Sequence, residues 1–316
     1  MDRADEVSTA HRPVEPDGSN PPQGTAAVRG GVPEPAPVSD PDGDLPLTLI
    51  RPRRGWQSLA LGDLWRYREL VYLLTWRDIK VRYKQTVLGI AWAVIQPVMA
   101  TVVFAVFFGN LGGLSRHTEV AYTVFVYAGI LPWGFFAEAV SQASQSLIAS
   151  SSLLTKVYFP RLAIPGASVA GLLVDFAISL VVMACLMVAY RVAPGPNLLL
   201  LPLVVVATVV AVLGAGTLLS ALTVAYRDFR YVVPFLLQVW MFASPVAYPL
   251  SLVPERWQAL YALNPMAGII DGYRSSLLGE PLHGTCLVVS VASAAVLFLI
   301  GTAYFRRFER RFADIV

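Results

Sequence analysis

Few ionisable side chains lie inside the long apolar stretches of this 316-residue chain, and this limits its chemistry. Glu138 and Asp175 are the only acidic residues within those stretches, and no lysine or arginine lies well inside one. An ion-coupled carrier or a proton relay usually places several ionisable groups there. We therefore interpret Asp175 as a structural hydrogen-bonding group rather than a proton carrier.

The sequence also lacks the patterns of nucleotide and metal sites. It contains no G-x-x-x-x-G-K-[ST] motif, so it cannot cradle the phosphates of ATP by itself. Its histidines and cysteines form no cluster with metal-ligand spacing, and no paired-aspartate or histidine motif suggests a membrane glycosyltransferase or phosphatase. We predict a chain that is not an enzyme and that binds no metal ion and no cofactor.

Aromatic rings offer a different chemistry, because the C–H face of a sugar stacks well on a ring. A passage lined with rings and hydroxyls would let a carbohydrate slide without tight binding at one point. Interface belts are the competing interpretation, since tryptophan and tyrosine collect at the membrane–water boundary. The channel-lining candidates are Trp92, Tyr127, Trp133, Phe136, Trp240 and Phe242.

The elements that would position these residues are membrane-spanning helices. Hydrophobic residues make up 56% of the chain and charged residues only 14%, whereas a soluble domain carries about 25% charged residues. Six apolar stretches are each long enough to cross about 30 Å of hydrocarbon at about 1.5 Å per residue. The fifth is the weakest, because it is short and contains three prolines. The expected spans lie near 87–110, 121–147, 163–190, 198–224, 232–250 and 284–305.

An amphipathic helix over 63–84 precedes the first span, and we expect it to lie flat on the membrane. The competing interpretation is an ordinary helix packed on a soluble core. Arg68, Asp78 and Arg82 fall outside its polar and apolar faces, so they would contact a partner subunit or snorkel. The polar face holds Arg66, Glu69, Arg77, Lys80 and Lys84, and the apolar face holds Trp65, Tyr72, Trp76 and Tyr83.

The distribution of lysine and arginine predicts the orientation. Basic residues are frequent in 51–84, after spans two and four and at the C-terminus, and both termini should therefore be cytoplasmic. Residues 1–50 contain nine prolines, nine acidic residues and three basic residues, without apolar periodicity. We interpret them as a disordered, acidic cytoplasmic tail.

Two connecting segments are candidates for functional elements. In 150–162, Ser151 or Ser152 can cap a short helix that Pro160 stops. This helix would either couple to a cytoplasmic motor subunit or carry ordinary interface aromatics. The residues that it would present are Lys156, Val157, Tyr158, Phe159 and Arg161.

The long loop before the last span should form two helices, near 254–262 and 265–278. Asn264 can cap the second helix, and Pro265 fits its first turn. Both helices are too short to span, so we expect a re-entrant hairpin that gates a pore, with a simple surface cap as the alternative. The gate candidates are Tyr261, Asn264, Pro265 and Met266.

Taken together, these segments resemble the permease subunit of type 2 ABC exporters for lipid-linked polysaccharides such as O-antigen, capsule, teichoic acid or cell-wall galactan. The resemblance covers about 60–316, which would form one transmembrane domain. It is carried by YKQTVLG at 83–89, LLTKVYFPRL at 153–162, the stretch from Ala225 to Pro249, and LNPMAGIIDGYR at 263–274.

The resemblance implies an all-α homodimer in a bacterial cytoplasmic membrane, with two separately encoded ATP-binding cassette subunits that bind ATP and magnesium. The cargo would be an undecaprenyl-linked polysaccharide, and no nucleic acid would be bound. Leu88 and Gly89 would lie near the lipid phosphate, where Arg82 and Lys84 suit a diphosphate. Two alternatives remain: a type 2 exporter of a drug or small lipid, and a membrane enzyme that acts on a lipid-linked sugar.

Overall fold

The computed structural model describes residues 66–84, 89–118, 120–156 and 159–309, and these residues fold into helices and connecting turns without a strand. The elements are α2 (Arg68–Lys84), α3 (Gly89–Phe104), the π-helical η1 (Ala105–Leu111), η2 (Leu114–His117), α4 (Tyr122–Ala149), α5 (Ser151–Lys156), α6 (Ala163–Ala189), η3 (Pro196–Leu200), α7 (Leu201–Ala225), α8 (Phe229–Phe242), η4 (Leu250–Leu252), α9 (Glu255–Ala262), α10 (Pro265–Leu278) and α11 (Gly284–Glu309).

Among the residues that the structure describes, five helical segments are long and apolar enough to cross a membrane, and they match five of the six expected spans. The all-helical, multi-pass membrane class is therefore confirmed. These five helical segments are Ala91–Leu111, Tyr122–Ala149, Ala163–Ala189, Pro196–Ala225 and Gly284–Glu309.

The fifth expected span, 232–250, is shorter in the structure than the sequence indicated. Helix α8 has 14 residues and ends at Phe242, so it extends only about 21 Å at about 1.5 Å per residue. The chain then leaves the helix and turns through the buried residues Ser244 to Ala247. Pro245 explains this early end, because proline cannot donate the hydrogen bond that continues a helix.

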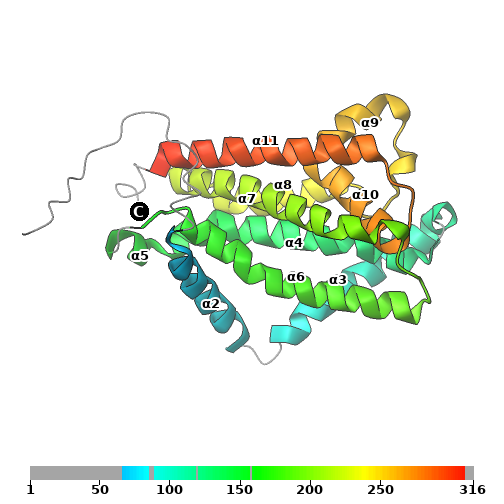
Figure 1. Ribbon diagram of the computed structural model, residues 1–316, viewed down its shortest axis with the longest axis horizontal. Helices are drawn as coiled ribbons and strands as arrows, with labels where there is room; N and C mark the ends of the chain where they lie inside the picture. Colours follow the sequence, from blue (N-terminus) through cyan, green and yellow to red (C-terminus); the bar gives the residue numbers. More distant parts are fainter. Residues whose placement is uncertain (1–65, 85–88, 119, 157–158, 310–316) are drawn as a thin grey trace, which may run out of the picture. The chain divides into compact units, whose positions relative to one another are not determined.

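Helix α4 is the centre of the bundle. It packs against α6, α7 and α10 and also contacts α3 and α8, and Figure 1 shows it running between α6 and α7. The side chains from Val124 to Ala128 are fully buried. Because so much of this apolar helix is buried, α4 is the element on which the other spans pack.

Helices α7 and α11 approach each other closely at two glycines. A Cβ atom on Gly301 would lie 2.2 Å from the carbonyl oxygen of Gly214, and a Cβ atom on Gly214 would lie 2.6 Å from the backbone nitrogen of Phe298. Small residues allow helix backbones in a membrane to come this near. The two helices therefore form one packed pair.

Helix α2 packs across α6 through Leu74 and the part of its apolar face next to it, and not through its aromatic side chains. Leu74 is buried against the bundle, and the Thr75 hydroxyl donates to the carbonyl oxygen of Ala167 at 3.4 Å. The aromatic face remains exposed, with Tyr72 and Trp76 more than half accessible. Arg82, one of the residues outside both expected faces, turns toward α6.

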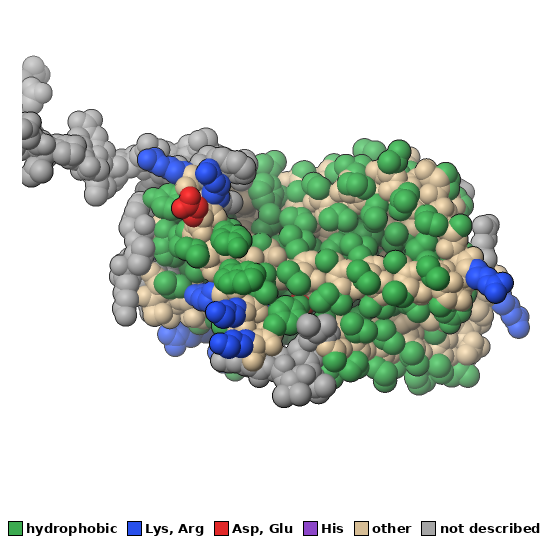
Figure 2. Space-filling view, turned by 60° about the horizontal axis from the view of Figure 1, so that its bottom comes forward, with side chains coloured by type: hydrophobic (Ala, Val, Ile, Leu, Met, Phe, Trp, Pro, Cys, Tyr) green, Lys and Arg blue, Asp and Glu red, His purple; other side chains and the backbone are tan. Residues whose placement is uncertain are grey.

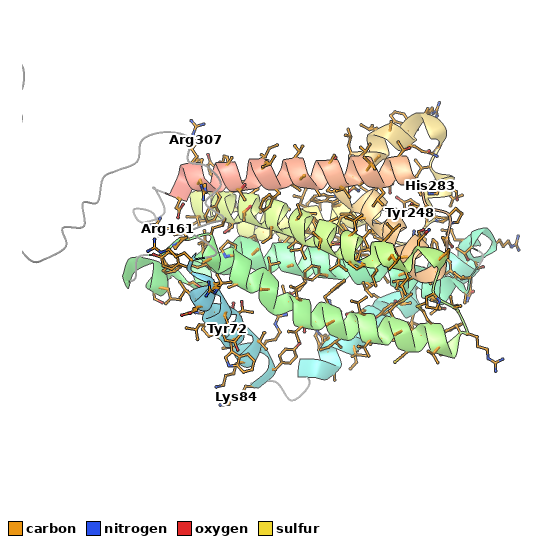
Figure 3. All side chains as sticks on the ribbon, viewed as in Figure 1. Tyr72, Lys84, Arg161, Tyr248, His283 and Arg307 are labelled. Carbon is orange, nitrogen blue, oxygen red and sulfur yellow. The ribbon has the colours of Figure 1, made fainter. Side chains whose placement is uncertain are left out.

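The two ends of the bundle differ in charge. Figure 2 shows a broad hydrophobic band with lysine and arginine gathered mainly at one end. Arg161 and Arg307 lie at this end, near α2, and Tyr248 and His283 lie at the opposite end (Figure 3). We call these the basic end and the far end. The far end also holds α9 and α10 (Figure 1).

We predict that Gly301→Ala lowers the thermal midpoint of the detergent-purified protein by several degrees. Its added methyl group would collide with Gly214, and overpacking of this kind costs about 1–3 kcal/mol. Gly166→Ala is the matched control, because a Cβ atom there would meet no heavy atom within 4 Å. Thermal unfolding followed by intrinsic fluorescence would measure both. Equal midpoints for the two variants would contradict the close approach.

Candidate functional site: a polar face on α4 and the two ends of the bundle

One face of α4 is polar and is only partly covered by the bundle. Glu138 is exposed, and Ser141, Gln142 and Gln145 are half-buried. Spacings of three and four residues place these side chains along one face of a helix. We call these four residues the polar stripe. The Gln142 amide nitrogen donates to Oε1 of Glu138 at 2.8 Å, so the stripe has internal hydrogen bonding.

The neighbouring helices α3 and α8 each add one exposed amide to an otherwise largely apolar surface. Away from the helix ends, the exposed charged or amide side chains of the described spans are Gln96 on α3, Glu138 on α4 and Gln238 on α8. By contrast, the exposed large residues along α6, α7 and α11 are apolar, among them Val181, Leu203, Val206, Val296 and Leu299.

This contrast distinguishes two sides of the protein. An acidic side chain at the centre of a spanning helix costs about 2.5–3.5 kcal/mol when it must enter hydrocarbon. The outer faces of α6, α7 and α11 can meet lipid tails at no such cost. The polar stripe is suited instead to water or to another protein surface.

Three of the six aromatic channel-lining candidates are buried, so the prediction that they line a passage is wrong for this chain. Tyr127 and Phe136 are fully buried and Trp133 is 5% exposed. They belong to the core, where the rings of Trp133 and Phe136 lie 5.5 Å apart between centroids. Trp92 and Phe242 are exposed, and Trp240 is partly buried.

The sequence carried a signal for the polar stripe that was not recognised. The spacing from Glu138 through Ser141 and Gln142 to Gln145 is that of one helical face. These residues lie inside the expected span 121–147, so hydropathy alone does not set them apart. Aromatic content was given more weight, although rings also fill the cores of helical bundles.

At the far end, Asn264 connects three segments of the chain. Its Oδ1 atom accepts from the backbone nitrogen of Met266 at 3.0 Å, which is the expected cap of α10. The same oxygen accepts from Nε1 of Trp240 on α8 at 2.9 Å, and Nδ2 donates to the Ser244 hydroxyl at 2.9 Å. Asn264 thus joins α8, the turn after it and α10.

Helix α10 is buried along its whole length, so it is not a surface cap. Arg274 is 2% exposed and donates to the carbonyl oxygens of Val246 at 2.7 Å and Tyr248 at 3.0 Å. Its guanidinium lies 3.7 Å from the ring centroid of Phe125 on α4. Arg274 therefore fixes the turn after α8 to the central helix.

Two of the four gate candidates, Tyr261 and Asn264, line a shallow hollow at the far end. The hydroxyls of Tyr248 and Tyr261 are 2.7 Å apart, whereas Pro265 and Met266 are buried at the start of α10. The hollow has a volume of about 350 Å³. It is lined by Trp240, Ala243, Trp257, Leu260, Tyr261 and Asn264. A gating role for these residues stays a prediction.

At the basic end, the expected coupling segment is anchored to the bundle. Helix α5 covers Ser151–Lys156, and Val157 and Tyr158 lie outside the described residues. Phe159 is 7% exposed and packs in a cluster with Leu74, Leu147, Ile164, Val224 and Phe305. The expectation that Phe159 is presented to a partner is therefore wrong, since its ring is an internal anchor.

Arg161 ties the same segment to the last helix. Its backbone nitrogen donates to Oε1 of Glu309 at 3.2 Å, and its guanidinium donates to the Glu309 carbonyl oxygen. The end of the coupling segment therefore contacts the final turn of α11. A coupling role for Lys156, Tyr158 and Arg161 stays a prediction.

The cationic turn at the end of α2 is joined to α6. Arg82 and Tyr83 both donate to the carboxylate of Asp175, which therefore has the structural role predicted for it. Burial and, next, the hydrogen bond to Asp175 raise the pKa of Tyr83 to about 12, so its phenol stays a donor at neutral pH. Lys84 is exposed, Gly89 begins α3, and Leu88 lies outside the described residues.

Comparison with known proteins decides between the families that this architecture allows. Residues 69–278 match the family described as ABC-2 type transporter. The chain belongs to this family. Members are membrane permease subunits that lack an ATPase domain, so the ABC-2 permease described here requires an ATP-hydrolysing partner.

Its relatives include polysaccharide permeases. The O-antigen export system permease protein RfbA of Myxococcus xanthus is 30% identical over 257 residues, which is 80% of this chain and 98% of the relative. RfbA of Klebsiella pneumoniae is 26% identical over 78% of this chain and 95% of its own. The polysialic acid transport protein KpsM of Escherichia coli is 22% identical over 74% and 91%.

We predict that Asp175→Ala releases the C-terminal turn of α2 from α6, because Arg82 and Tyr83 lose their shared acceptor. Hydrogen–deuterium exchange of the purified permease should then increase in residues 80–84. Asp78→Ala is the control, since its partner is the exposed Arg77 on the same helix. If both variants show the exchange of the wild type, Asp175 does not hold α2.

Proposed function

We propose that this ABC-2 permease forms the channel of an exporter that moves an undecaprenyl-linked polysaccharide across a bacterial cytoplasmic membrane. The polar stripe on α4 carries the proposal, because it gives a membrane-embedded surface the amide, hydroxyl and carboxylate groups that hydrogen-bond to sugars. The similarity to RfbA and KpsM supports a polysaccharide as the cargo.

A single copy leaves the polar stripe open on one side, so the channel requires a second copy. We infer a homodimer in which α3, α4 and α8 of each subunit face the path. Gln96 and Gln238 would then add hydrogen-bonding groups beside the stripe, and the exposed rings of Trp92 and Phe242 would add stacking surfaces. Trp240 would contribute near the far end, where it is partly buried.

The driving motion comes from two ATP-binding cassette subunits, which bind ATP and magnesium. They dock at the basic end, which we place on the cytoplasmic side together with both termini. The contact is made by α5 and the residues after it, including Lys156, Val157, Tyr158 and Arg161. Phe159 passes the motion inward, since its ring packs where α2, α4, α6, α7 and α11 meet.

The cargo enters at the basic end and leaves at the far end. The lipid diphosphate is received near Leu88 and Gly89, where Lys84 and Arg82 supply positive charge. Arg82 must exchange its contact with Asp175 for the phosphate. Tyr261, Asn264, Pro265 and Met266 lie in the gate, whose buried helix α10 closes the far end.

We predict that Gly134→Trp blocks export while the transporter still assembles. Gly134 is exposed one turn before Glu138, and a Cβ atom there would meet no heavy atom within 4 Å, so an indole can project into the path without disturbing the core. Gly166→Trp on α6 is the matched control, because a Cβ atom there would also meet no heavy atom within 4 Å. Surface polysaccharide and intracellular lipid-linked polymer are measured in cells that express each variant.

Gly134→Trp should reduce surface polymer at least about tenfold and accumulate lipid-linked polymer inside the cell, since one large side chain can occlude a path lined by side chains. Gly166→Trp should behave as wild type. Normal export by Gly134→Trp would refute the path along α4. Depletion of the permease without accumulation of polymer would instead refute the cargo and favour a drug or small lipid.

A further inference from the structure

The carboxylate of Glu138 lies at a depth where it can select among cargoes. It is the seventeenth residue of the 28-residue helix α4, so about 17 Å of helix separates it from the nearer end at about 1.5 Å per residue. It is exposed on the polar stripe, and its hydrogen bond is to the neutral amide of Gln142. In the part of the chain that the structure describes, it forms no ion pair with a lysine or arginine.

The surroundings of Glu138 leave its charge uncompensated. Helices α3 and α4 contain no lysine or arginine, and the one arginine of α8, Arg230, is in its first turn at the basic end. The other polar groups of this face are neutral amides and hydroxyls. A carboxylate on the wall of a narrow passage acts on every charged group that passes it, as charged rings do in channels.

We infer that Glu138 makes this permease selective for polysaccharides that carry no negative charge along the polymer. The inference rests on the proposed function, because it concerns the path that the polar stripe lines. In a dimer two Glu138 carboxylates face one path. Each acidic repeat unit would then pass two negative charges, so the electrostatic repulsion recurs with every unit. The lipid diphosphate, by contrast, passes only once per chain.

The neutral members of the stripe fit the same class of cargo. Ser141, Gln142 and Gln145 offer donors and acceptors that exchange readily among sugar hydroxyls. None of them is a cation that could hold a carboxylate or phosphate. The path thus provides weak, repeated hydrogen bonds to an uncharged chain and repulsion to a polyanion.

Two undecaprenyl-linked polymers of matched length test this inference: a neutral hexose polymer, and one with a carboxylate on every repeat unit. Inside-out vesicles that contain the permease with its ATPase partner receive either polymer, and ATP-dependent movement into the vesicle lumen is measured. Wild type should transport the neutral polymer about tenfold faster, because repulsion at a charged constriction acts on each acidic unit. The preference should decrease as salt is added.

Glu138→Gln keeps the shape and the hydrogen bonding of the side chain while removing its charge. It should raise the rate for the acidic polymer relative to that for the neutral polymer several-fold, so that the ratio of the two rates approaches one. Glu69→Gln is the control, since Glu69 is an exposed carboxylate on α2 away from the path, and it should alter neither rate.

Equal rates for the two polymers in the wild type would overturn the inference even if no variant could be purified. It would also fail if Glu138→Gln left the preference intact. In both cases the proposed function would stand as long as the neutral polymer moved. If wild type moved neither polymer, the proposed function itself would be refuted together with the inference.

Discussion

Hydrocarbon cannot solvate a carboxylate, and this constraint explains how the bundle is arranged. Helices α6, α7 and α11 present valine, leucine and isoleucine outward. Among the described residues, the exposed amides and the exposed acid away from the helix ends lie on α3, α4 and α8. A protein surrounded by lipid on all sides would not be stabilised by gathering its exposed polar side chains on one side. The separation is expected if one side of each subunit meets a hydrated path shared with a second subunit.

The same bundle connects its two ends through α4. At the basic end, Leu147 of α4 belongs to the cluster that encloses Phe159. At the far end, Phe125 of α4 lies under the guanidinium of Arg274, which holds the turn after α8. In the proposed mechanism, this continuous helix is the element that would carry a displacement from α5 to the far end. Close packing is what allows such transmission, since dense interiors resist compression.

Much of this fold could be predicted from the sequence, because hydropathy and capping are local properties. Five spans fell where apolar length placed them, and Asn264 with Pro265 marked the start of α10. The burial of Phe159 and Tyr127 could not be predicted, because an aromatic residue in an apolar stretch suits a core, a lipid face or a channel equally well. Only the packing of α4 against its neighbours decides among these environments.

The hydrogen-bond donors to Asp175 could not be predicted from the neighbouring sequence either. The carboxylate was recognised as structural, but its donors, Arg82 and Tyr83, come from a helix more than ninety residues earlier in the chain. Similarly, the three-and-four spacing of the polar stripe was visible, yet its meaning depends on which face of α4 the other helices leave uncovered. These features are tertiary, so sequence periodicity alone does not reveal them.

The central claim, that the stripe on α4 lines a hydrated path, is tested most directly by the accessibility of single cysteines. Gln142→Cys, Gln145→Cys, Val181→Cys and Val206→Cys would each be made in a background without Cys185 and Cys286, and labelled in membranes with a charged maleimide. The account predicts rapid labelling at 142 and 145 and little at 181 and 206, because only the first pair meets water. Labelling of the α6 and α7 positions with protection of the α4 positions would contradict it.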